Sequence, residues 1–466
     1  MPLTVKGLIE ASRRALTSKP FRLLVGSLSP KEIIASLEIL TGVRREASLK
    51  VRSLSFMLGK LVDLLAGEMG VNREEVLKFL QDPYNRRGLA SIIKGIATYG
   101  VTRPQVLYAP FMVVWDFTKR CNLRCRHCYA NASPLSPPDE LTLEQKLEVL
   151  RQLDEAGVAA LSFSGGEPLM STDFWLLAEK ASEAGMYVSV ATNGTLITEN
   201  VANKLKEVGV RYVEVSLDSV NPEKHDSFRG VPGSWERAVR GIRNAKRAGL
   251  EVGIAMTVTK LNYRELPDMI DLAKELKVDR LIAFNFVPTG RGKESLELDL
   301  SAQERVEVLN LLYRELSQGE LQAFSTSPLY SVISLKGGRV SPTHFADLSL
   351  PLDEALPLAE FLGGCGAGRI YCSIEYNGDV QPCVFLPVKV GNVLKDGFLN
   401  IWHNSPLLMA LRDRDRRDYA CHDCPYKYVC GGCRARAYAY FGDPLGPDPG
   451  CPLRDNEIYA EHQLTV

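Results

Sequence analysis

The cysteines constrain this chain more than any other feature of its sequence. There are eleven, and they fall into three groups with none left over. Four thiolates complete a 4Fe–4S cluster, whereas three thiolates leave one iron open. Eleven cysteines therefore match one open cluster and two closed ones. The groups are a C-x3-C-x2-C triplet of Cys121, Cys125 and Cys128; a loose trio of Cys365, Cys372 and Cys383; and Cys421, Cys424, Cys430 and Cys433 followed by Cys451.

The bulk properties of the chain favour a globular protein without nucleic-acid binding. Lys plus Arg equals Asp plus Glu at 56 each, so no net positive field attracts a phosphate backbone. The N-terminus lacks the apolar core of a signal peptide, and no apolar run reaches the roughly eighteen residues of a spanning helix. We expect a cytoplasmic protein, with contact to a membrane surface as an alternative. Cysteines in that compartment bind metal more often than they form disulfides.

Residues 1–108 carry helical signals throughout. Ser29-Pro30 is a helix start with Ser as N-cap and Pro at the first helical position. Apolar residues then recur close to helical spacing, which predicts the core of a small helical domain. The alternative is the wall of a hydrophobic tunnel or a membrane contact. These residues are Leu49, Val51, Leu54, Met57, Leu61, Val62, Leu64 and Leu65.

Residues 109–290 alternate between short apolar runs and helical patterns. Glycines such as Gly157 and Gly185 end the helical patterns, as a left-handed C-cap requires. Six such units predict an α/β fold, a partial (β/α)6 barrel with its chemistry at the C-terminal strand ends. Residues 291–360 are then a connecting region, and 361–466 a loop-rich iron–sulfur domain organised by its metals. The predicted strands are Phe111–Trp115, Ala159–Phe163, Tyr187–Ala191, Tyr212–Ser216, Val252–Val258 and Leu281–Phe286.

The triplet lies directly after the first predicted strand and resembles the cluster loop of the radical SAM superfamily. His127 stands at the aromatic position of that loop, Cys125-Arg-His127-Cys128. The resemblance implies a 4Fe–4S cluster whose open iron holds S-adenosylmethionine. It also implies reductive cleavage of that cosubstrate to a 5′-deoxyadenosyl radical. A three-cysteine zinc knuckle is the alternative.

Further motifs of that family follow the later strands. Gly165, Gly166, Glu167 and Pro168 resemble the GGE motif that holds the methionyl amine, and glycine lets the backbone approach a ligand. The resemblance also implies S-adenosylmethionine contacts from the ends of the third and fourth strands and from one arginine. A simple turn or a structural ion pair is the alternative for each. These residues are Asn193, Ser216, Asp218 and Arg229.

The eight C-terminal cysteines resemble the SPASM extension of radical SAM enzymes, which carries two auxiliary 4Fe–4S clusters. The family's connectivity implies an inner cluster on Cys365, Cys372, Cys383 and Cys433. It implies an outer cluster on Cys421, Cys424, Cys430 and Cys451. Cys430 and Cys433 are separated by two residues where the family has three, which puts the role of Cys433 in doubt. Two structural zinc sites are the alternative.

The resemblance implies hydrogen abstraction from an unactivated carbon, with electrons from an external ferredoxin or flavodoxin type of donor. The helical first segment favours a large hydrophobic substrate, so C–C bond formation on a membrane lipid is the leading hypothesis. Peptide crosslinking or modification and decarboxylation of a porphyrin propionate are the alternatives. An iron–sulfur electron carrier without catalysis is the non-enzyme alternative. A lipid enzyme should show a long apolar tunnel, and a porphyrin enzyme a broad slot with paired arginines.

Overall fold

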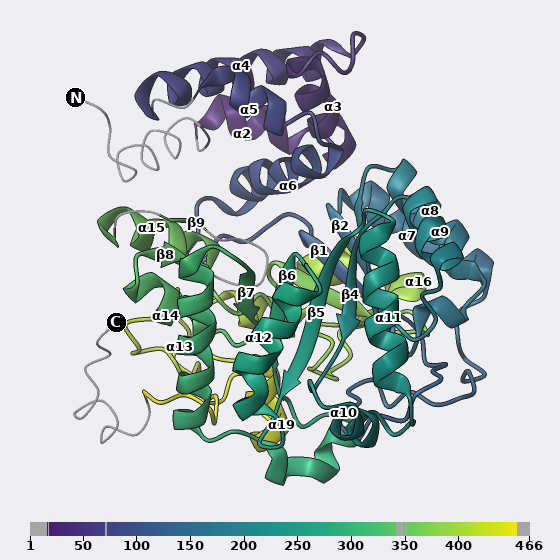
Figure 1. Ribbon diagram of the computed structural model, residues 1–466. Coiled ribbons are helices and arrows are strands. Elements are labelled where there is room, and N and C mark those ends of the chain that lie inside the picture. Colours follow the sequence, from purple (N-terminus) through teal and green to yellow (C-terminus); the bar gives the residue numbers. More distant parts are fainter. Residues whose placement is uncertain (1–15, 17, 70–71, 342–347, 350–351, 454–466) are drawn as a thin grey trace.

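A computed structural model of the chain describes residues 16, 18–69, 72–341, 348–349 and 352–453 (Figure 1). Its main element is a ten-stranded sheet in the order β12-β11-β10-β1-β2-β3-β4-β5-β6-β7. Strands β1 to β7 run parallel, which requires a crossover between each pair. The predicted α/β fold is therefore present as an open barrel.

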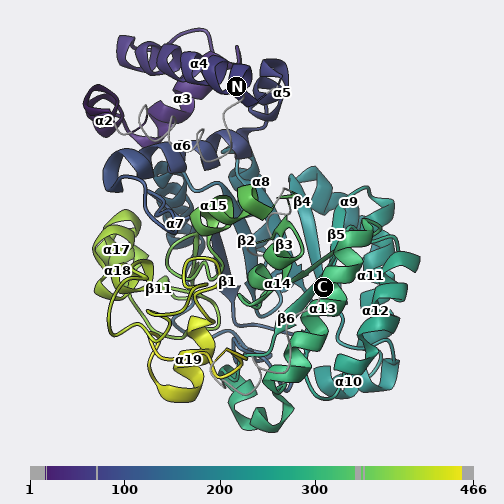
Figure 2. The same ribbon diagram turned by 90° about the vertical axis from the view of Figure 1, so that its left-hand side faces the viewer.

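All six predicted strands are present, each within three residues of its predicted limits. They are buried runs rich in β-branched and aromatic residues, as parallel strands covered on both faces require. Each strand is followed by a helix that covers the outside of the barrel (Figures 1 and 2). The strands are β1 (Met112–Thr118), β2 (Ala160–Gly165), β3 (Tyr187–Thr192), β4 (Val210–Ser216), β5 (Glu251–Val258) and β6 (Arg280–Asn285). The helices are α7 (Leu143–Ala156), α8 (Asp173–Glu183), α9 (Glu199–Glu207), α10 (Pro222–Arg229), α11 (Ser234–Arg247) and α12 (Leu266–Glu275), with short 3-10 turns at Pro168–Met170, Tyr263–Glu265 and Gly290–Leu298.

Two further strands extend the barrel from segments outside the six predicted units. Strand β7 (Gln322–Ser325) pairs with β6, and β10 (Tyr371–Ile374) pairs in parallel with β1. The cysteine-rich segment therefore contributes a strand to the barrel wall. The remaining elements are α13 (Ala302–Gln318), α14 (Tyr330–Lys336), β8 (Arg339–Val340), β9 (Leu348–Ser349), α15 (Leu352–Leu362), β11 (Asp379–Gln381), β12 (Gly391–Asn392), α16 (Val393–Asp396), α17 (Phe398–Asn404), α18 (Pro406–Arg412) and α19 (Arg434–Phe441).

The N-terminal helices form a domain with its own hydrophobic core. Val51, Leu54 and Leu58 are buried in it, whereas Leu49 is 84% exposed. The prediction of a helical domain core is confirmed for Val51 and Leu54, whereas Leu49 was wrongly placed in it and lies on the surface. The described helices are α2 (Lys19–Gly26), α3 (Pro30–Leu40), α4 (Leu49–Met69), α5 (Arg73–Phe79) and α6 (Pro83–Tyr99); the side chains of Leu64 and Leu65 lie outside the described residues.

This domain lies at the end of the barrel opposite α10 and α19 (Figure 1). Buried Arg87 of α6 donates to the carbonyl oxygen of Val158 at 2.6 Å and to the Asp154 carboxylate at 2.9 Å. Arg211 at the start of β4 donates to Asp82 of the N-terminal domain at 2.7 Å. The N-terminal domain therefore covers the N-terminal strand ends, away from the loops that carry the first cysteine triplet.

No helix in the described ranges combines the length and the apolar character needed to cross a membrane.

Candidate active site

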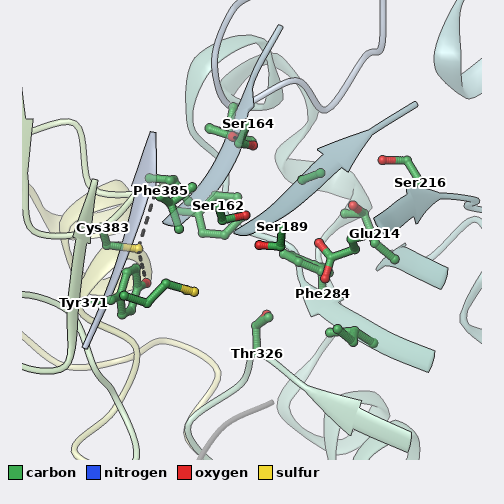
Figure 3. Close-up of a pocket in the computed structure, with 18 of the residues that line it drawn as sticks. Ser162, Ser164, Ser189, Glu214, Ser216, Phe284, Thr326, Tyr371, Cys383 and Phe385 are labelled. Atoms are coloured by element: carbon green, nitrogen blue, oxygen red, sulfur yellow. Dashed lines mark hydrogen bonds between the residues drawn. The ribbon is translucent and has the colours of Figure 1, made fainter. Parts of the chain in front are cut away.

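A cavity of about 580 Å³ occupies the inside of the barrel (Figure 3). Successive side chains of a strand point to opposite faces, so alternate residues of each strand line this space. Most of these residues are small, which leaves the interior open where a closed barrel is usually packed with bulky side chains. The lining includes Ala160, Ser162 and Ser164 of β2, Ser189 and Ala191 of β3, Glu214 and Ser216 of β4, and Ala255 and Thr257 of β5.

The first cysteine triplet lies at the C-terminal end of this cavity, where all three of its cysteines form part of the lining. Backbone N–H groups of Leu123 and Ala132 donate to the sulfurs of Cys121 and Cys128, both at 3.4 Å. Burial raises the pKa of the Cys121 thiol to about 12. A bound cation must therefore displace the proton of the Cys121 thiol.

Contacts from one distant segment hold the triplet loop. Arg291 donates from Nε to the carbonyl oxygen of Cys125 at 3.0 Å, and its backbone N–H donates to that of Cys128 at 3.0 Å. Neighbouring Gly290 has a φ of +57°, and a Cβ there would lie 2.3 Å from the carbonyl oxygen of Tyr129. Only glycine fits this close approach without movement of the loop.

A buried ion pair lies directly beneath the triplet. Arg229 donates to Asp218 at 2.6 Å and to the sulfur of Cys125 at 3.7 Å. Burial opposes ionisation of Asp218, but the charge of Arg229 outweighs it and holds the pKa of this carboxyl below its usual value. The other Asp218 oxygen accepts from the backbone N–H of Thr257 at 2.9 Å. Asp218 is therefore fully engaged in positioning Arg229 and strand β5.

The His127 ring packs against this ion pair. It stacks on Phe228 with ring centroids 4.1 Å apart, and its Nε2 lies 3.7 Å from Asp218. Burial lowers the pKa of His127 to about 3, so the ring is neutral at physiological pH. Its buried Nδ1 has no hydrogen-bond partner among the described residues.

The carboxylate of Glu167 fastens the Gly165-Gly166 turn to the end of β3. It accepts from the Thr192 hydroxyl and the Asn193 N–H, both at 2.8 Å. Burial raises the pKa of Glu167 to about 7. Its side chain therefore organises the loop, while the two glycines present backbone to the cavity.

The structure brings most of the predicted cosubstrate residues to one place. Six of them line the cavity beside the triplet: His127, Gly165, Gly166, Asn193, Ser216 and Arg229. Glu167, Pro168 and Asp218 are buried behind that wall. The roles assigned to these nine residues stay predictions.

The four C-terminal cysteines that the family's connectivity implies for the outer cluster lie near one another, and their role as ligands stays a prediction. Burial raises the pKa of the Cys430 thiol, and its neighbours Cys421 and Cys451 raise it further. Burial also raises the pKa of the Cys451 thiol, with further contributions from Cys421 and Cys424. Arg434 donates to the sulfur of Cys421 at 3.9 Å. Within the described residues, no three Cys, His, Asp or Glu side chains converge tightly enough to hold a single metal ion.

The inner group contains three of its four predicted members. Burial raises the pKa of the Cys433 thiol, and its neighbours Cys365 and Cys383 contribute to this shift. All three cysteines line the barrel cavity. Cys433 therefore lies near these two cysteines despite the two-residue spacing to Cys430, and its role as a ligand stays a prediction. The fourth predicted member, Cys372, is instead fully buried in the main hydrophobic core of the barrel.

Sequence reasoning did not single out the residues that line the middle of the cavity. Ser162 and Ser189 are paired across β2 and β3, so their side chains lie next to each other on the inner face. Phe284 of β6 and Phe385 of the C-terminal region have ring centroids 6.3 Å apart, and both rings border the cavity (Figure 3). Alternation along the strands was the available signal, because small residues recur at every second position of β2.

Two protein families match this chain. The radical SAM superfamily matches residues 115–273, and the SPASM iron–sulfur cluster-binding domain matches residues 365–425. The chain is 36% identical over 347 residues to an AdoMet-dependent heme synthase of Methanosarcina barkeri, covering 74% of this chain and 97% of the relative. The chain belongs to the radical SAM superfamily. It is also 34% identical over 358 residues to the mycofactocin maturase MftC of Mycobacterium tuberculosis, covering 74% of this chain and 83% of that one.

A solved structure shares the fold. Streptococcus suis SuiB bound to precursor peptide SuiA superposes with a TM-score of 0.58 at 21% identity, over 81% of this chain and 80% of that one. Membership of the superfamily implies a 4Fe–4S cluster with S-adenosylmethionine, and the SPASM domain implies auxiliary clusters. The residues present fit these groups. Three thiols, two of them with backbone N–H donors, border a cavity large enough for a cosubstrate and a substrate.

Proposed function

We propose that this radical SAM enzyme decarboxylates a propionate side chain of a porphyrin. The observation that carries the proposal is the likeness to the heme synthase, which extends over 97% of that relative. The cavity supports it, because it is a wide chamber with hydroxyl groups on one wall and aromatic rings on another. A flat ring system edged with carboxylates matches both kinds of wall.

The chemistry balances with one hydrogen atom and one electron removed. Cys121, Cys125 and Cys128 would hold the cluster that, with S-adenosylmethionine bound, would supply the radical needed to take a hydrogen atom from the side chain. Loss of carbon dioxide and one further electron then converts the propionate to a vinyl group. The auxiliary clusters offer a path for that electron, and an external donor of the ferredoxin or flavodoxin type reduces the first cluster.

The residues of the cavity have defined tasks in this proposal. The hydroxyls of Ser162 and Ser189 face the cavity and are adjacent, so they can donate together to one carboxylate. Burial raises the pKa of Glu214 to about 7, so a neutral Glu214 can donate a third hydrogen bond. Phe284 and Phe385 pack against the faces of the macrocycle.

The hypothesis of a membrane-lipid substrate loses its basis here. The N-terminal domain does not border the triplet; it lines the opposite end of the cavity through Asp82, Tyr84 and Asn85. Tyr84 packs on Tyr187 with ring centroids 5.1 Å apart, and Tyr187 donates to Glu251 at 2.9 Å. Two arginines at this end are engaged by protein groups. Arg211 pairs with Asp82, and Arg280 contacts Glu251 and Gln322.

Peptide modification is the second candidate, and the likeness to MftC favours it. The described N-terminal residues form helices, whereas peptide-modifying members often carry a winged-helix domain with a β-hairpin. This difference favours the porphyrin.

One assay tests the proposal. The iron-loaded enzyme is incubated anaerobically with reductant, S-adenosylmethionine and a porphyrin that carries propionates. We expect 5′-deoxyadenosine together with a porphyrin that has lost carbon dioxide and two hydrogens. If 5′-deoxyadenosine forms while the porphyrin mass stays unchanged, the substrate assignment is wrong. A Ser162→Ala/Ser189→Ala variant should raise the KM for the porphyrin and leave uncoupled cosubstrate cleavage intact.

A further inference from the structure

The inner auxiliary cysteines border the same cavity as the first triplet. Cys365, Cys383 and Cys433 all line it, each from a different loop. Their surroundings are built for thiolate ligands. The Phe385 N–H donates to the sulfur of Cys383 at 3.4 Å, and the Cys433 N–H donates to Asp448 at 2.8 Å. This part of the C-terminal region is therefore a wall of the substrate chamber.

Cys372 cannot join these three in the observed fold. It follows Tyr371 on β10, and Tyr371 points into the cavity. Neighbouring side chains of a strand point to opposite faces, so Cys372 must point outward. It is fully buried among the core residues that include Trp402 and Leu408, and the charged group that acts on its thiol is Arg412.

Its strand is held in place on both sides. Cys372 is paired with Val113 of the central strand β1, and Ser373 is paired with Gln381 of β11. Bringing the Cys372 sulfur to the inner face would require a one-residue shift of β10, which would turn Tyr371 into the core. The register of the sheet therefore excludes this cysteine as a ligand.

Two of the protein oxygens near the three thiols are already engaged. Tyr371 donates its hydroxyl to the sulfur of Cys383 at 2.7 Å. Asp448 accepts from the Cys433 N–H and from buried Arg436. Both groups are therefore committed to contacts other than the replacement of a missing thiolate.

We infer that the inner auxiliary site is held by three thiolates, from Cys365, Cys383 and Cys433, and that its fourth position faces the cavity. A 4Fe–4S cluster with three thiolates leaves one iron open. That position accepts an oxygen or nitrogen donor from the molecule in the chamber. The substrate would then be held between two clusters, each with an open iron, whatever its identity proves to be.

The first test compares two cysteine variants. Both are made in a Cys121→Ala/Cys125→Ala/Cys128→Ala background, so that only auxiliary iron remains. We expect Cys372→Ala to keep about eight irons per chain, and Cys383→Ala to keep about four. The outer cluster, with its own electron paramagnetic resonance signal, reports that each variant is folded. Loss of the inner cluster from folded Cys372→Ala would overturn the inference.

The second test does not depend on folding of a core variant. The triple-alanine protein is reduced and exposed to isotopically labelled cyanide, a ligand for open iron sites. We expect hyperfine coupling from the label to the inner cluster in electron–nuclear double resonance, and its loss in Cys383→Ala. Absence of coupling in the loaded triple-alanine protein would show a fourth protein ligand and would refute the open position.

Discussion

The close approach of Gly290 to the triplet loop makes a quantitative prediction for Gly290→Ala. The new Cβ would lie 2.3 Å from the carbonyl oxygen of Tyr129 and 2.4 Å from that of Cys128, whereas ordinary contact begins at 3.4 Å. The loop must therefore move by about 1 Å, and a displacement of that size near a reacting centre costs roughly 100-fold in rate. The positive φ adds about 1–2 kcal/mol of backbone strain. We expect S-adenosylmethionine cleavage to fall about 100-fold.

Gly319→Ala provides the matched control. Gly319 also has a positive φ, of +78°, but a Cβ added there, at the end of α13, would meet nothing within 4 Å. This variant carries the backbone strain without the collision, so its cleavage rate should equal that of the wild type. The assay is 5′-deoxyadenosine formation by loaded protein with iron counted per chain. Equal rates in Gly290→Ala and Gly319→Ala would refute the assignment of this loop as the cosubstrate site.

Three further predictions concern charged groups in the barrel and in the N-terminal domain. Asp299→Asn leaves buried Arg436 with only the Asp448 carboxylate among the described residues and weakens the contact to Arg305, and we expect a loss of about 1.5–3 kcal/mol in urea unfolding. Burial opposes ionisation of Asp299, but its bonds with Arg436 lower the pKa of the carboxyl, so this stability is present above about pH 4 and is lost below it; a variant with the wild-type acid profile would contradict the pairing. Arg87→Ala removes the bonds that hold the N-terminal domain, and we expect a loss of about 2–3 kcal/mol with faster proteolysis before residue 109; unchanged digestion would show that other contacts suffice. The pKa of Glu214, about 7, predicts a KM for a carboxylate substrate that rises as pH passes 7 and becomes flat in Glu214→Gln; an unchanged profile in the variant would assign the pH effect elsewhere.

The six barrel strands could be predicted because each is a continuous buried run between turn signals. Strand β5 reads Glu251 to Val258, with β-branched residues in the middle, and Gly249 ends the helix before it with a φ of +75°. Local sequence therefore determines these elements almost to the residue. The side chains predicted at their C-terminal ends meet because parallel strands end at one edge.

Strands β7 and β10 could not be predicted in the same way. Each has four residues, and each is a strand only because a long neighbour supplies its hydrogen bonds. Their segments carry neither the length nor the flanking signals that distinguish a strand from a loop. The position of the N-terminal domain is also a tertiary property, because it depends on single polar contacts such as that of Arg87 with Val158.

The number of cysteines predicts the number of clusters, but strand geometry decides which cysteines can be ligands. Counting gave three plus four plus four, since it treats every cysteine as an available ligand. A strand admits only every second side chain to one face, so the cavity-facing Tyr371 and the following Cys372 cannot both reach the same cluster. The count of three clusters survives this constraint, but the division of ligands becomes three, three and four, with Cys372 in the core. The open iron of the first cluster then serves S-adenosylmethionine, and that of the inner auxiliary cluster gives the same chamber a separate point at which it can hold a substrate.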